Sequence, residues 1–133
     1  MSFPALLPPP AASSLATQAN LREDAARVAH YLAENLAPST RRVYQSDWAL
    51  FSAWCDGKQL PALPASGETV AAYLAAEAAQ GRRVATLRHR LAAIRLAHEL
   101  TDQHNPTASH IVRATLAGIA RVHLHAIGRQ RRR

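Results

Sequence analysis

Apolar residues recur at intervals of three and four along the long segments of this chain that lie between its prolines and glycines. In the segment 40–56, for example, Tyr44, Trp48, Phe51 and Cys55 fall on one side of a helix. Such spacing is typical of amphipathic α-helices, and no segment alternates apolar and polar residues as a half-buried strand does. We therefore expect an all-α fold, in which four to five helices form a compact bundle.

Capping and helix-breaking residues set the limits of the predicted helices. Ser and Asn side chains satisfy the free N–H groups at helix starts, whereas Gly and Pro favour helix ends. We expect helices at 21–36 with Asn20 and Glu23 as a capping box, at 40–56 between Ser39 and Gly57, at 67–80 between Ser66 and Gly81, at 84–100, and from Pro106 and Thr107 to about His123.

The length of 133 residues suits a single domain. We expect residues 1–19, rich in proline, alanine and serine, to be a flexible arm, residues 20–127 to be the helical domain, and residues 128–133 to be a basic linker.

Cys55 is the only cysteine, so the chain can form no internal disulfide and no cysteine-based zinc site. No segment is apolar enough to span a membrane, and the first residues lack the basic start of a signal peptide. These observations predict a cytoplasmic protein.

The net charge of +7 is distributed unevenly along the sequence. Residues 1–81 contain five basic and seven acidic residues, a net charge of −2, whereas residues 82–133 contain eleven arginines and two acidic residues, a net charge of +9. A basic half of this kind indicates a polyanionic partner. The seven histidines are accompanied by no cysteine cluster or paired carboxylate, so we expect no metal, no cofactor and no small-molecule ligand.

The predicted helix at 84–100 carries the most specific indication of a DNA contact. On a helical projection, the expected buried side consists of Val84, Leu87, Leu91, Ile94 and His98, and the expected outer face consists of Ala85, Thr86, His89 and Ala93. Arginines surround that outer face, with Arg88 and Arg95 on one flank, Arg90 on the other, and Arg82 and Arg83 just before the helix. Small and hydrogen-bonding residues allow close approach to base edges, while arginines neutralise phosphates. A solvated face with scattered arginines is the alternative interpretation.

The start of the predicted helix at 40–56 is a second polar cluster. It contains Thr40, Arg41, Arg42 and Gln45. Side chains and backbone N–H groups at such a helix start can hold a phosphate. An ordinary polar helix start explains the same residues equally well.

Several short segments of the sequence, taken in order, resemble the core-binding domain of the tyrosine recombinases and phage integrases, above all the Cre and Xer types. They are 38–55, Pro61 to Pro64, 69–74, Gly81 with 86–94, His98, 105–107, and Val112–Arg113 with Gly118–Ile119. Together they cover about residues 20–125. This resemblance implies a SAM-like domain of four to five helices that forms the N-terminal half of a clamp around double-stranded DNA. A protein of this kind is expected to be bacterial or phage-like and associated with the nucleoid.

The resemblance also implies which residues face DNA. In the family, the second and fourth helices of this domain lie against the major groove. Matching positions in this chain are Thr40, Arg42 and Val43 in one helix and Ala85, Thr86, Arg88 and His89 in the other. With the arginines beside them, the predicted DNA-binding residues are Thr40, Arg41, Arg42, Val43, Arg82, Arg83, Ala85, Thr86, Arg88, His89 and Arg90. The family's first and fifth helices contact other recombinase protomers on DNA, which implies the same for 21–36 and 108–123.

Catalysis in the resembled family belongs to a second domain, whose tyrosine attacks a DNA phosphate. No residue of this chain is assigned to that domain, and the segment 128–133 is expected to lead towards it. His110 and Arg113 match the spacing of a catalytic motif, but they lie in the DNA-binding part and no tyrosine follows them. We therefore expect no catalysis from this chain alone and a site-specific recombinase as the parent protein. A stand-alone helical DNA-binding regulator and a helical protein-interaction module are the alternatives.

Overall fold

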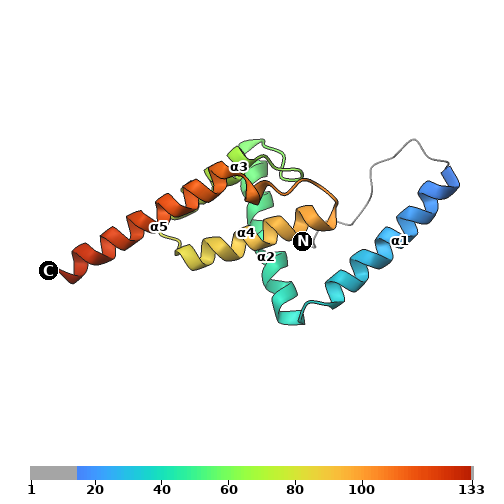
Figure 1. Ribbon diagram of the computed structural model, residues 1–133, viewed down its shortest axis with the longest axis horizontal. Coiled ribbons are helices and arrows are strands. Elements are labelled where there is room, and N and C mark those ends of the chain that lie inside the picture. The colour runs from blue at the N-terminus through green and yellow to red at the C-terminus, as the bar shows by residue number, and fades with distance from the viewer. Residues whose placement is uncertain (1–14, 133) are drawn as a thin grey trace.

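The computed structural model describes residues 15–132 of the chain (Figure 1). Its elements are α1 (Leu15–Glu34), α2 (Pro38–Lys58), α3 (Gly67–Ala79), α4 (Val84–Leu100), the short 3-10 helix η1 (Pro106–Ala108) and α5 (His110–Arg131). Between residues 15 and 132 there is no strand. The predicted all-α bundle is therefore confirmed.

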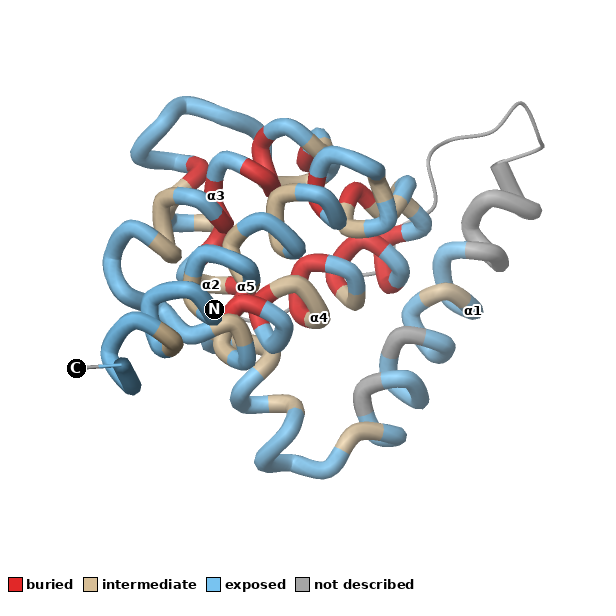
Figure 2. Tube along the Cα trace, turned by 60° about the vertical axis from the view of Figure 1, so that its left-hand side comes forward, coloured by how far each residue is buried: buried red, intermediate tan, exposed pale blue. Residues whose placement is uncertain are grey.

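The core lies where α2, α3 and α4 meet, and α5 closes it from one side (Figures 1 and 2). The predicted stripe of α2 is buried at Trp48, Phe51 and Cys55, whereas Tyr44 is half-buried. The ring of Tyr73 from α3 meets that of Phe51 edge-on, with the ring centroids 5.1 Å apart. Core packing therefore accounts for these aromatic side chains of α2.

Two predicted helix boundaries agree with the local geometry of α3. The Ser66 hydroxyl accepts a hydrogen bond from the Thr69 backbone N–H at 3.1 Å, as an N-cap should. After the helix, Gly81 has a φ of +88°, a conformation that glycine adopts without strain.

The boundaries of α1 and α2 differ from those predicted. Asn20 lies inside α1, which begins at Leu15, so it caps nothing. In α2, Pro38 occupies the first helical turn in place of the predicted Ser39 cap, because a proline there sacrifices no helical hydrogen bond. Gly57 lies inside the helix, and Gln59 ends it in the left-handed conformation.

Both ends of the described chain project from the bundle (Figure 1). α1 extends away from α2, α3 and α4, and α5 continues to Arg131, beyond its predicted end at His123. Residues 128–131 of the predicted linker are therefore helical. Of the predicted arm 1–19, residues 1–14 lie outside the described part, and residues 15–19 belong to α1.

Candidate nucleic-acid interface

The two helices predicted to meet DNA cross each other in the bundle (Figure 1). At the crossing, the Trp48 ring of α2 meets the His98 ring of α4 edge-on, with centroids 6.2 Å apart. Asp47 of α2 interacts electrostatically with His89 and Arg90 of α4. The starts of both helices therefore extend from one rigid junction.

The start of α2 is accessible at most of the predicted positions. Thr40, Arg42 and Val43 are exposed. Arg41 is half-buried, and its guanidinium lies 3.7 Å from the Glu34 carboxylate at the end of α1. This arrangement leaves Arg42 as the freer of the two cations for an incoming phosphate.

The start of α4 is accessible as well. Arg82 and Arg83 are exposed in the preceding loop, and Ala85, Arg88 and His89 are exposed in the first turns. Thr86 is half-buried, so only part of its side chain reaches the surface. The most specific part of the predicted site thus lies on the outside of the molecule.

Arg90 and Ala93 correct the predicted orientation of α4. Both were expected on the outer side, and both are buried, Arg90 with 7% and Ala93 with 0% of its surface exposed. Because residues follow one another by about 100° around a helix, the buried side is turned by roughly a quarter turn from the prediction. The small side chains of Ala93 and Ala97 allow close packing there, and the most exposed side now carries Arg88, Arg95 and Glu99.

Arg90 is held inside the bundle by two residues of α3. Its Nη1 donates to the Tyr73 hydroxyl oxygen at 3.1 Å and to the Glu77 carboxylate in a short contact. Burial raises the pKa of Tyr73 to about 12, so this hydroxyl stays protonated near neutral pH. A buried arginine requires such partners because an unpaired internal charge is costly. Arg90 is therefore a structural residue of the bundle and not part of the exposed surface.

Two acidic residues that the sequence analysis did not single out lie beside the predicted site. The Glu77 carboxylate also accepts a hydrogen bond from Arg82 Nε at 3.0 Å. The Oδ2 atom of Asp47 is buried, and no residue in 15–132 forms a hydrogen bond with it. Burial raises the pKa of Asp47 against the opposing effects of Arg90 and His89. A signal for Glu77 existed, because it continues the apolar pattern of Val70, Tyr73 and Leu74 along α3.

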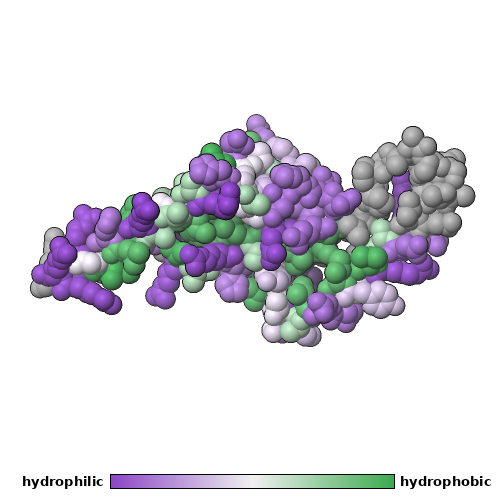
Figure 3. Space-filling model, in the orientation of Figure 1, coloured by the Kyte–Doolittle hydropathy of each residue, from purple (hydrophilic) through white to green (hydrophobic). Residues whose placement is uncertain are grey.

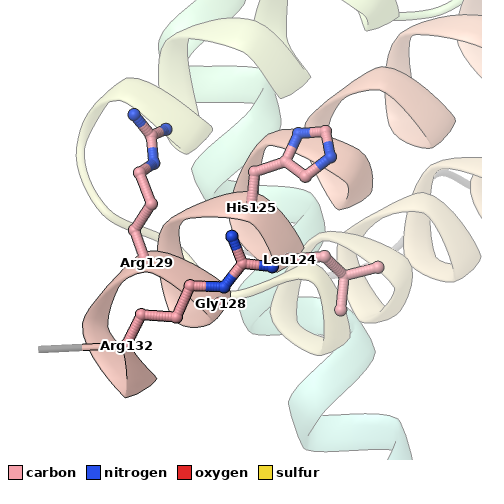
Figure 4. Close-up of a pocket in the computed structure, with 5 residues that line it drawn as sticks. All are labelled: Leu124, His125, Gly128, Arg129 and Arg132. Atoms are coloured by element: carbon pink, nitrogen blue, oxygen red, sulfur yellow. The ribbon is translucent and has the colours of Figure 1, made fainter.

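The helix α5, which projects from the bundle, is also basic. The helix contains four arginines, at 113, 121, 129 and 131, and no acidic residue. Figure 4 shows His125, Arg129 and Arg132 arranged around Gly128 near its end. Beside α4, a groove of about 620 Å³ is lined by Arg83, Val84, Ala120, His123, Leu124 and Ile127. Figure 3 shows apolar surface along this part of α5 between hydrophilic side chains.

The described residues offer neither a membrane span nor a metal site. No helix between residues 15 and 132 is both long and apolar enough to cross a membrane. Within the same part of the chain, no three histidine, cysteine, aspartate or glutamate side chains gather in a way that could hold a metal ion.

Comparison with known proteins gives one informative similarity. The chain is 33% identical over 93 residues to a protein of Selenomonas ruminantium described as an integrase/recombinase xerD homolog. The aligned residues are 68% of this chain and 27% of that protein, so the chain spans about a quarter of its relative. A comparison with the models of known protein families gives no match. The similarity is therefore to one part of a protein described as an integrase or recombinase.

Proposed function

We propose that this chain is the N-terminal DNA-binding domain of a site-specific tyrosine recombinase. The observation that carries the proposal is that the start of α2 and the basic start of α4 are both exposed, on two helices that cross in one core. Helices present side chains to base edges through their first turns, where the helix dipole also favours phosphate. The similarity to a xerD homolog supports the same function.

Within this proposal, the orientation of α4 suggests separate roles for its residues. Arg88 lies on the most exposed side of the helix, and its guanidinium is the group that best matches the acceptor pair of guanine. His89 and Ala85 lie beside it and permit close approach to the groove. Arg83 and, on α2, Arg42 are exposed, and we assign them to phosphates of the DNA backbone.

The proposal assigns no catalytic role to this chain. Nucleophilic attack on a DNA phosphate would require the second domain of the parent recombinase. The expected behaviour of the chain alone is therefore DNA binding without cleavage. A supercoiled plasmid incubated with the protein should remain supercoiled, whereas relaxation would contradict this assignment.

Other protomers are the second proposed partner. Val28, Tyr31 and Leu32 of α1 are exposed at helical spacing, and Tyr31 has 70% of its surface exposed. On α5, Val122, Leu124 and Ile127 are exposed along the projecting part. The stripe on α1 is typical of a surface that another protein covers. Of the three residues on α5, Leu124 and Ile127 share one side, whereas Val122 lies about 160° from Leu124 around the helix. We place the contacts between protomers on DNA at these two helices.

The test of DNA binding is a titration of duplex DNA at several salt concentrations. A protein that contacts phosphates loses affinity with a log–log slope of about 0.9 for each phosphate neutralised. We expect a steep slope for the wild type, and a slope smaller by about one for Arg42→Ala. Arg22→Ala is the matched control, because it removes the same charge from an exposed position on the side of α1 opposite Tyr31. Weak binding with a flat salt dependence would contradict the proposed function.

A further inference from the structure

The Glu77 carboxylate lies between two arginines, one buried and one exposed. Its Oε2 contacts the guanidinium of Arg90, whose side chain is 8% exposed, and the guanidinium of Arg82, whose side chain is 50% exposed. The side chain of Glu77 itself is 15% exposed. One carboxylate thus joins a cation inside the core to a cation at the surface.

The inner contact fixes the position of the carboxylate. Arg90 is held by the Tyr73 hydroxyl as well as by Glu77, and the α4 helix carries it into the core. A carboxylate paired in this way cannot turn outward without leaving the buried charge of Arg90 unpaired. Glu77 is therefore a rigid point to which Arg82 is attached.

The outer contact leaves the phosphate-binding end of Arg82 available. Glu77 engages the Nε atom of Arg82, and among residues 15–132 no hydrogen bond or ion pair occupies its two Nη atoms. Those two atoms form a fork that can bind two oxygens of a phosphate. An arginine held at Nε also loses less conformational freedom on binding than a free one.

We propose that Glu77 is a positioning residue for DNA binding, which holds Arg82 with its guanidinium fork directed at a backbone phosphate beside the start of α4. The inference rests on the proposed function, since it needs a duplex at this surface. By its charge alone, an acidic residue among basic residues would weaken the attraction to a polyanion. A positioning role for Glu77 would instead strengthen it. The two views predict effects of opposite sign.

The decisive variant is Glu77→Gln, which keeps the shape of the side chain and makes the net charge one unit more positive. We expect it to bind duplex DNA about threefold to tenfold more weakly than the wild type, because one oriented phosphate contact is lost. Glu68→Gln is the matched control, since it removes the same charge from an exposed position on the same helix. The control should bind as tightly as the wild type or slightly more tightly. Tighter binding by Glu77→Gln would overturn the proposal.

A second pair of variants connects the effect to Arg82. In an Arg82→Ala background, Glu77→Gln should change the DNA affinity by less than about twofold, because the residue that it positions is absent. Arg82→Lys should bind more weakly than the wild type and no more weakly than Arg82→Ala, because a lysine ammonium keeps the charge but has no fork to share between a carboxylate and a phosphate. Arg82 is half exposed, so both of its variants are expected to fold even where Glu77→Gln does not. An Arg82→Lys variant with wild-type affinity would overturn the proposal.

Failure of this inference is distinguishable from failure of the proposed function. Wild-type protein that shows no salt-dependent DNA binding would refute both. Wild-type protein that binds with a steep salt dependence, together with a Glu77→Gln variant that binds more tightly, would refute only the role of Glu77. Thermal unfolding followed by circular dichroism shows at which temperature each variant is fully folded, and the titrations are made below it.

Discussion

His98 is the polar side chain at the centre of the core. It is completely buried, and its Nε2 accepts the Ala65 backbone N–H at 2.9 Å. Its Nδ1 lies 2.7 Å from the Ile94 carbonyl oxygen, so a neutral imidazole with its proton on Nδ1 satisfies both contacts. Burial lowers the pKa of His98, His104 lowers it further, and only the hydrogen bond to Ile94 opposes this.

This environment predicts that the protein becomes less stable as the solution is acidified. The pKa of a histidine in the unfolded chain is about 6.5. Below that pH the unfolded state binds a proton that the folded state resists, so the stability contributed by neutral His98 is complete above pH 6.5 and is lost as pH falls towards the lowered pKa. Urea unfolding at pH 7.5, 6.5 and 5.5 should show a free energy of unfolding that decreases by up to about 1.4 kcal/mol per pH unit below pH 6.5.

The control for this prediction is His98→Gln, which keeps a hydrogen-bonding group without a titrating ring. Its free energy of unfolding should be lower at pH 7.5 and should change less on acidification. The raised pKa of Asp47 changes the free energy of unfolding in the opposite direction, because the folded state takes up this proton more readily than the unfolded state. That effect falls at the acidic pH values at which carboxyl groups titrate. Equal pH dependence in wild type and variant would place the relevant proton elsewhere.

The exposure of single residues in the candidate site was predictable where the helical pattern places them on the outer side. Arg42, Arg88 and His89 are exposed, as the pattern of the two helices indicates. Arg90 was not predictable by the rule that charged residues face solvent. Its partner Glu77 lies on another helix, and only the fold shows that the two charges compensate each other.

Among the elements, α3 and α5 approach each other closely at one glycine. A Cβ atom at Gly67 would lie 2.5 Å from Ser109 Oγ and 3.1 Å from Ser109 Cβ, just before α5. By contrast, a Cβ atom at Gly118, inside α5, would have no neighbour within 4 Å. One glycine is thus required by packing, while the other only weakens its helix.

These two glycines predict opposite effects of the same substitution. Gly67→Ala should destabilise the protein by about 1–3 kcal/mol, because Ser109 must shift to make room. Gly118→Ala should stabilise it by about 0.5–1 kcal/mol, because alanine restricts the unfolded chain and favours the helix. Thermal unfolding of both variants gives the comparison. Stabilisation by both would show that α3 and α5 do not meet closely at Gly67.

The elements themselves were predictable to different degrees. The bounds of α4 agree with the sequence prediction at 84–100, because Gly81 and the polar loop after Leu100 isolate the helix. The start of α1 was predicted too late, because Asn20 was interpreted as a cap, and the end of α5 was predicted too early, because the basic segment 128–133 was interpreted as a linker. The rotation of α4 was not predictable, because it depends on which small side chains α2 packs against.

At the scale of the whole molecule, the apolar stripe of α1 lies apart from the basic start of α4, whereas α5 carries both arginines and exposed apolar side chains. The basic residues follow the start of α4 and the length of α5, while the acidic Glu77 and Asp47 lie within the junction of helices. α1 is set apart from this junction and carries its apolar stripe away from the core (Figures 1 and 2). On α1, contact with further protomers can therefore be altered separately from stability and DNA attraction.

This separation predicts that a charge placed on α1 impairs assembly and leaves the fold intact. Tyr31→Asp interrupts the stripe of Val28, Tyr31 and Leu32, whereas Ala26→Asp adds the same charge to an exposed position about 140° away around the helix. Neither variant should change the free energy of unfolding by more than about 0.5 kcal/mol, since both positions are at the surface. On long duplex DNA, Tyr31→Asp should show less cooperative binding than the wild type, and Ala26→Asp should not. Equal cooperativity in all three proteins would remove α1 from the contacts between protomers, whereas equal loss in both variants would assign the effect to charge alone.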